Sequence, residues 1–108
     1  MPVSRTLTVK FTATSDGDNT IVSSPGVGFA IVVVGFVATG ATTAGIAQMK
    51  SSGGLVLMDL SLGVGSGVSY VGTRDSPAFR CLSNQAFMVN NSAGLDTYGG
   101  IVYFIDTD

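Results

Sequence analysis

The stretch "VGFAIVVVGFVATG", residues 27–40, lies inside a run without charged residues that extends from Asp18 to Lys50. An apolar run of this kind suits a membrane-spanning helix, a buried helix or a buried strand. A membrane-spanning helix needs about 20 predominantly apolar residues. The strongly apolar part of this stretch ends at Ala38, the polar cluster "TGATTAG" follows it, and no Lys or Arg cluster flanks it. The pattern therefore argues against a membrane span.

A buried helix is also disfavoured, because the stretch is rich in Val and Ile and contains Gly35. Branched side chains lose rotamer freedom in a helix, and a glycine costs about 1 kcal/mol there. We therefore predict a strand that is apolar on both faces, with Gly35 at a bulge or at a close backbone contact. One face points to the core and the other to a neighbouring subunit. The alternation assigns Phe29, Ile31, Val33 and Val37 to the core face and Val32, Val34 and Phe36 to the subunit face.

The rest of the chain also reads as short strands separated by turn signals. Residues 4–12, "SRTLTVKFT", alternate apolar and polar side chains, and "SDGDN" at 15–19 and "SPG" at 24–26 interrupt the pattern. In residues 55–63, "LVLMDLSLG", the alternation turns Asp59 outward and places Val56, Met58, Leu60 and Leu62 on the core face. Counting about eight such segments, we predict one all-β domain over residues 1–108, a jelly-roll-like antiparallel β-sandwich of about eight strands.

The composition points to a protein that assembles with other subunits. Of the 108 residues, 45% are hydrophobic and 11% are charged, against about 25% charged in an ordinary globular chain. We expect other subunits to cover part of this surface. The net charge is −2, and no basic patch is available to neutralise phosphates, so we expect no nucleic-acid binding. The first residues lack a signal-peptide pattern, so we expect the protein to fold in a cytoplasm.

Catalytic and metal-binding patterns are scarce. The chain has no histidine, which excludes Ser-His-Asp and Cys-His arrangements and imidazole zinc sites. Asp16 and Asp18 resemble the start of a calcium loop that lacks its remaining ligands, and Asp59 and Asp75 make a poor carboxylate pair. The single cysteine, Cys81, is expected to be buried. We expect no enzymatic activity, no cofactor and no metal.

One charge-dense segment, "GTRDSPAFR" at residues 72–80, has the character of a contact loop. Arginine and aromatic residues are enriched at interface hot spots, and loops on a rigid sandwich often carry contacts. The alternative is a solvated loop with a local Arg–Asp pair. Together with the outer face of the apolar strand, this segment gives the interface candidates Val32, Val34, Phe36, Arg74, Asp75, Phe79 and Arg80.

The order of the segments resembles a known family. "NTIVSSPG", the long apolar strand, the "TGATT" turn and the closing "FMVNNSAGLDTYGGIVYFID" are similar to the small jelly-roll decoration, or cement, proteins of tailed bacteriophages. The resemblance rests on the Asn90 to Ala93 turn and the Gly99 to Tyr103 strand. It implies a homotrimer on the outer capsid surface of the virion, bound to the major capsid protein and stabilising the expanded head.

A second function remains open at this stage. Knobs of phage tails and fibres are built in the same sandwich style and bind receptors or glycans. In that case Tyr70, Arg74 and Asp75 would contact the sugar. The three tyrosines and the absence of tryptophan offer few aromatic platforms for sugar binding.

Overall fold

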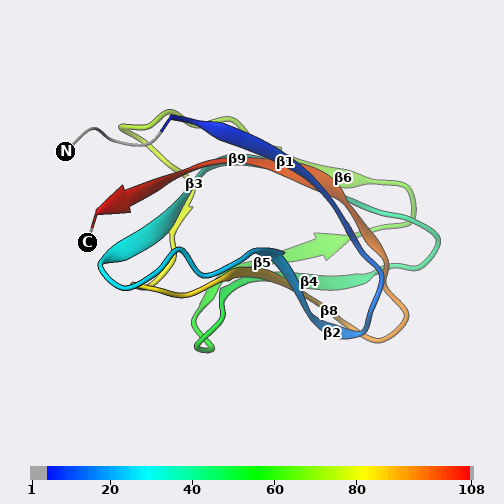
Figure 1. Cartoon of the computed structure of the whole chain (residues 1–108). Helices are drawn as coiled ribbons and strands as arrows, with labels where there is room; N and C mark the ends of the chain where they lie inside the picture. Colours follow the sequence, from blue (N-terminus) through cyan, green and yellow to red (C-terminus); the bar gives the residue numbers. More distant parts are fainter. Residues whose placement is uncertain (1–4, 108) are drawn as a thin grey trace.

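The computed structural model describes residues 5–107, which form nine β-strands in two antiparallel sheets packed face to face (Figure 1). The predicted all-β sandwich is confirmed. The described residues contain no helix that is long and apolar enough to cross a membrane.

The two sheets have the strand order of a jelly roll. The β3 sheet runs β1 (Leu7–Ala13), β9 (Thr97–Thr107), β3 (Phe29–Gly40) and β6 (Gly67–Tyr70), and β7 (Phe79–Arg80) also pairs with β3. The β4 sheet runs β2 (Gly17–Val22), β8 (Phe87–Asn91), β4 (Gly45–Ser51) and β5 (Val56–Leu62). The first strand therefore pairs with the last, β2 with β8, β3 with β6, and β4 with β5. This nested pairing is the jelly-roll arrangement, and the additional strand β7 is only two residues long.

The apolar stretch forms β3, the strand paired with β9 on one side and with β6 and β7 on the other. Its register with β9 shifts at Val34, because Val33 lies opposite Tyr103 while Gly35 lies opposite Val102. The predicted close backbone contact at Gly35 is confirmed, since a Cβ at this position would lie 2.8 Å from the Tyr70 carbonyl oxygen. The bulge lies directly before Gly35, with Val34 as the extra residue.

The bulge exchanges the faces of the residues that follow it. Ile31 and Val33 point into the core as predicted, but beyond the bulge Phe36 joins them, while Val37 is 46% exposed on the outer face. The assignment of Phe36 to the outer face and of Val37 to the core is therefore wrong. A bulge adds one residue to one strand, so a strict alternation fails past that point.

A second bulge alters β5 in the same way. Met49 lies opposite Met58 and Lys50 lies opposite Val56, which leaves Leu57 as the extra residue. Leu57 packs against the core, whereas Val56 is 42% exposed. The predicted core positions of Leu60 and Leu62 and the predicted exposure of Asp59 are confirmed. The predicted core position of Val56 is wrong. Met58, also predicted for the core face, is 40% exposed.

The core between the sheets is centred on stacked phenylalanines. The ring of Phe79 lies 5.5 Å from that of Phe36 and 6.3 Å from that of Phe87, centre to centre. Cys81 is buried beside them as predicted, and burial raises the pKa of its thiol to about 11. These contacts hold β3, β7 and β8 together across the two sheets.

A buried polar group closes the core near the end of β1. The Asn91 side chain donates a hydrogen bond to the Ala13 carbonyl oxygen at 2.7 Å and accepts one from the Thr97 hydroxyl at 2.7 Å. Asn91 and Thr97 are both buried. These two bonds join β1 and β9 in one sheet to β8 in the other.

Candidate interaction surfaces

The charge-dense segment interrupts an edge strand. Tyr70 in β6 lies opposite Phe36, and Phe79 in β7 lies opposite Val33, so β6 and β7 continue one line along β3. Between them residues 71–78, which we call the 71–78 loop, leave the edge and lie above the outer face of the β3 sheet (Figure 1). A turn closed by hydrogen bonds between Thr73 and Ser76 shapes its tip.

Arg74 attaches this loop to the outer face. Its guanidinium carbon lies 3.9 Å from the centre of the Phe104 ring, and its Nη1 donates a hydrogen bond to the Thr6 hydroxyl at 2.9 Å. A cation above an aromatic face is stabilised by the negative charge density of the ring. The loop thereby links β9 to the residue that precedes β1.

Val32 and Val34 form a small buried cluster with Phe104 on this outer face. The prediction that they lie on the outer face is correct. They are only 2% and 6% exposed in the single chain, so they offer little surface to a neighbouring subunit, and the predicted subunit contact stays a prediction. The sequence could not show this, because the loop that lies over this face comes from a distant part of the chain.

The other interface candidates divide between core and surface. Phe36 and Phe79 are buried in the core and offer little surface to a partner. Asp75 is exposed. Arg80 forms an ion pair with Asp106 at 2.8 Å, and this hydrogen bond holds the pKa of the Asp106 carboxyl below its ordinary value. Arg80 and Asp106 thus join β7 to the end of β9.

An apolar groove of about 340 Å³ opens beside the loop on the same outer face. Its lining includes Val34, Val37, Val71 and Val102, with Tyr70 at one side. The Tyr70 hydroxyl donates to the Ser76 carbonyl oxygen at 3.2 Å. The remaining polar side chains of the lining are two hydroxyls, those of Thr8 and Ser69. A sugar site needs several converging polar groups, so this groove gives the glycan alternative little support.

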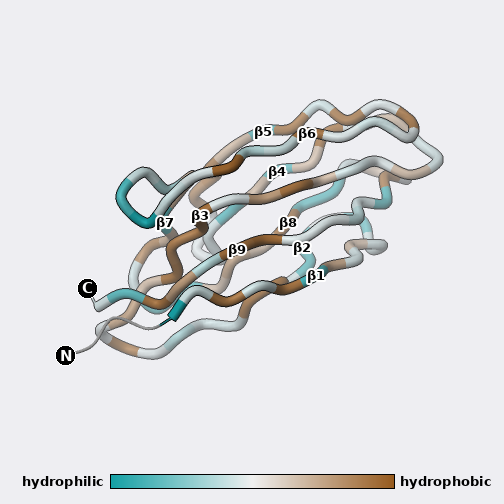
Figure 2. The backbone as a smooth tube through the Cα atoms, turned by 90° about the horizontal axis from the view of Figure 1, so that it is seen from above, coloured by the Kyte–Doolittle hydropathy of each residue, from teal (hydrophilic) through white to brown (hydrophobic). Residues whose placement is uncertain are grey.

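Exposed apolar side chains are most frequent on β5, on β6 and on the segments that adjoin β5, β6 or β7. In Figure 2, β5 and β6 run along one side, and β1 and β2 run along the other. Among the described residues, twelve large hydrophobic side chains are exposed. Seven belong to β5, to β6 or to segments that adjoin β5, β6 or β7, and we call their surface the β5–β6 side: Leu55, Val56, Met58, Val64, Tyr70, Val71 and Leu82. The other five are Leu7, Val27, Val37, Ile46 and Tyr98. Of these, Val37 lines the same groove as Val71, and Ile46 lies opposite Ser61 of β5.

Sequence reasoning missed the β5–β6 side, although a signal for it was present. Between Lys50 and Arg74 the only charged residue is Asp59. This is a second run of low charge, and it is more interrupted by Gly and Ser than the one that formed β3. The exposure of Val56 followed from the β5 bulge, which alternation alone did not reveal.

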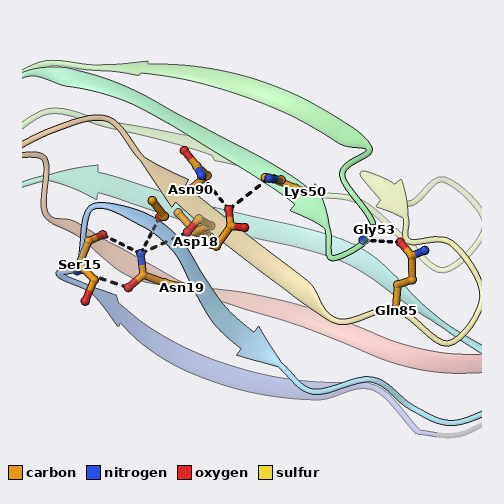
Figure 3. A network of polar contacts seen from close by, with 9 residues as sticks. Ser15, Asp18, Asn19, Lys50, Gly53, Gln85 and Asn90 are labelled. Atoms are coloured by element: carbon orange, nitrogen blue, oxygen red, sulfur yellow. Dashed lines mark hydrogen bonds and ion pairs between the residues drawn. The ribbon is translucent and has the colours of Figure 1, made fainter.

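Charged side chains also lie on β1, β2 and β4. Lys10 lies on β1, and Asp18 on β2 accepts hydrogen bonds from Asn90 at 2.7 Å and from Lys50 at 3.1 Å (Figure 3). The hydrogen bonds from Asn90 and Lys50 hold the pKa of the Asp18 carboxyl below its ordinary value of 3.8. Lys50 of this polar cluster lies opposite the exposed Val56 of β5, so charged and apolar side chains are neighbours in the β4 sheet.

The carboxylates of Asp16 and Asp18 accept hydrogen bonds from other residues of the chain. Asp16 accepts a hydrogen bond from the Gly94 amide at 2.9 Å, while Asp18 bonds to Asn90 and Lys50. Asn19 fastens the same turn through a hydrogen bond from its side-chain nitrogen to the Ser15 carbonyl oxygen at 2.9 Å (Figure 3). The predicted turn is confirmed at residues 15–16 and at Gly17, whose φ is 80°, but β2 already begins at Gly17, so Asp18 and Asn19 belong to the strand. Over residues 5–107 no group of three or more potential metal-binding side chains occurs.

Comparison with protein-family models, with curated proteins and with solved structures finds no match for this chain. The case for a function therefore depends on the geometry described above.

Proposed function

We propose that this protein is a structural component of a virus particle, a decoration protein that binds the outer surface of a phage head as a homotrimer. The observation that supports this most is the nested strand order, with β1 paired to β9, β2 to β8, β3 to β6 and β4 to β5. Jelly rolls of this kind are common in viral capsid proteins. Because one fold serves several functions, the fold supports the proposal and needs a direct test.

The surface chemistry supports binding in place of catalysis. The β5–β6 side exposes apolar side chains with one charged residue on its two strands, Asp59. Surfaces of this kind gain free energy when another protein covers them. A decoration protein that binds only the assembled shell stabilises that shell by mass action. No chemical step is required for this role.

The proposal predicts a specific binding partner, the major capsid protein in its assembled, expanded form. The test is co-sedimentation of the purified protein with expanded empty heads that were assembled without it, followed by electron microscopy. We expect saturable binding, density on the outer surface with three-fold symmetry, and heads that disassemble at a higher temperature. Absence of binding, or density confined to the tail, would overturn the proposal.

The tail-knob alternative gives a different outcome in the same experiment. Density at the tail tip, together with glycan-array binding that is lost in Tyr70→Ala, would favour a receptor-binding role. The apolar lining around Tyr70 makes decoration the function that the geometry supports better.

A further inference from the structure

We propose that the 71–78 loop is a cover that opens as a unit while β6 and β7 stay paired with β3, and that its opening exposes the apolar outer face of β3. In the closed state the loop hides apolar side chains, and in the open state these side chains face water. The change occurs in the free chain, so it goes beyond the proposed function and does not depend on it.

The loop determines how exposed the outer side chains of β3 are. Val34 and Val37 both lie on the outer face of this strand, but Val34 is 6% exposed and Val37 is 46% exposed. Gly72 lies against the Val34 carbonyl oxygen, and Arg74 lies over Phe104, which packs against Val34. Val37 lies beside β6, beyond the loop. An apolar side chain on the outer face of an antiparallel sheet meets solvent unless another segment covers it, so the loop accounts for the burial of Val34.

The two ends of the loop are held by contacts that do not involve its middle. Before the loop, Tyr70 pairs with Phe36, and their rings are stacked with 6.5 Å between centres. At its end, the Ala78 amide donates a hydrogen bond to the Val33 carbonyl oxygen at 2.9 Å, and the ring of Phe79 packs in the core. The residues between these points can therefore move without unpairing β6 or β7.

The middle of the loop is attached through exposed contacts. Arg74 contacts the Phe104 ring and donates a hydrogen bond to Thr6, and the Tyr70 hydroxyl donates to the Ser76 carbonyl oxygen at 3.2 Å. Both hydrogen bonds are exposed to solvent. The only large hydrophobic side chain of the loop, Val71, is 93% exposed and adds little packing. Exposed contacts are individually weak, and a segment held by them opens at a lower free energy than the core.

Gly72 allows the closed loop to lie directly against β3. A Cβ at this position would contact the Val34 carbonyl oxygen and would lie 2.6 Å from the Ser76 carbonyl oxygen. Both are backbone atoms, so a side chain here must displace the loop from the strand. The closed position therefore depends on Gly72 at the neck of the loop as well as on Arg74 in its middle.

Opening enlarges an apolar surface that is already present. Val34 and Val102 line the groove of about 340 Å³, and Val34 also belongs to the cluster with Val32 and Phe104. Release of the loop joins the groove and the cluster into one apolar face on β3 and β9. The loop thereby regulates how much apolar surface the chain presents.

A thiol reporter under the loop tests the proposal. Val34→Cys places a thiol in the covered cluster, Val37→Cys places one on the uncovered part of the same face, and the native Cys81 reports on the core. The rate of labelling by a disulfide reagent is measured in buffer and at low urea concentrations, and peptide mass spectrometry locates the label. We expect Val34→Cys to react at least about tenfold more slowly than Val37→Cys, yet faster than Cys81. Its rate should also rise less steeply with urea than that of Cys81, because opening of the loop exposes less surface than unfolding.

Two substitutions that loosen the cover are then added to the reporter chains. Arg74→Gln is expected to raise the labelling rate of Val34→Cys about 2- to 30-fold, because the cation–π contact is lost. Gly72→Ala should raise it about fivefold or more. Neither should change the rate of Val37→Cys. Val71→Ala, at a position that is already exposed, is the matched control and should leave the rate of Val34→Cys unchanged.

Three results would each overturn the proposal. Equal urea dependence for Val34→Cys and Cys81 would mean that the loop opens only when the whole domain unfolds. Labelling of Val34→Cys as fast as that of Val37→Cys would mean that the loop leaves Val34 uncovered. Rates unchanged by both Arg74→Gln and Gly72→Ala would mean that neither residue keeps the loop closed.

Discussion

The guanidinium of Arg74 lies 3.9 Å above the ring of Phe104 and also donates a hydrogen bond to Thr6. These contacts connect the 71–78 loop to β9 and to the residue before β1, and they lie over an apolar cluster that would otherwise face water. The loop is therefore part of the packing of the β3 sheet.

Replacing Arg74 tests this attachment. We expect Arg74→Gln to lower the free energy of unfolding by about 0.5–2 kcal/mol, because the cation–π contact is lost. Arg74→Lys should lose less, since it keeps the positive charge. The measurement is urea denaturation, with hydrogen exchange of residues 71–78 as a local readout. Unchanged exchange in Arg74→Gln would show that other contacts hold the loop.

Gly35→Ala tests the bulge in β3. A Cβ here would lie 2.8 Å from the Tyr70 carbonyl oxygen, so either β6 or β3 must move. We expect a loss of about 1–3 kcal/mol in unfolding free energy. Val37→Ala, at an exposed outer position nearby, should cost less than about 1 kcal/mol. Equal losses in the two variants would contradict the close contact.

Asn91→Leu tests the buried polar group. The substitution leaves the Thr97 hydroxyl and the Ala13 carbonyl without the partners that they have now. An unsatisfied buried polar group costs about 1–3 kcal/mol, and we expect a loss of that size or larger in thermal or urea unfolding. Asn90→Ala, on the polar outer face beside Asp18, serves as the control and should cost about 1 kcal/mol or less. Adding Thr97→Val to Asn91→Leu should recover part of the loss.

Asp18 predicts a dependence of stability on pH. Its pKa is lower in the folded chain than the ordinary value of 3.8, so its contribution is fully present above about pH 4–5 and is lost as the pH falls through the folded pKa. The urea midpoints of the wild type and Asp18→Asn should therefore differ at pH 7 and converge as the pH falls through the folded pKa of Asp18, below 3.8. Added salt should reduce the difference at pH 7. A difference that stays constant with pH would exclude ionisation as its cause.

Cys81 predicts slow thiol chemistry in the native state. With a pKa of about 11, against 9.0 ordinarily, its thiolate fraction at pH 8 is about 100-fold lower than in the unfolded chain. Burial slows the reaction further. Labelling with a disulfide reagent should be slow in buffer and fast in denaturant. Rapid labelling of the native chain would show that β7 opens readily.

The sequence was sufficient to predict strands and their turns, because alternation and glycine signals are local. It was insufficient to predict which face of the sheet the side chains of Phe36, Val37 and Val56 lie on. Each of these depends on a bulge, and a bulge is set by pairing with a strand far away in the chain. The burial of Val32 and Val34 likewise depends on the 71–78 loop. Arg74 was identified as a contact residue from its type, but its partners, Phe104 and Thr6, follow only from the fold.

The break between β6 and β7 also has a practical consequence. Each half of the edge strand is held separately by β3, so the chain leaves the sandwich at Tyr70 and returns at Phe79 with both ends fixed. A peptide inserted after the exposed Asp75 would lengthen the loop without changing the register of either half. The same break makes this position suitable for displaying a foreign epitope on the protein.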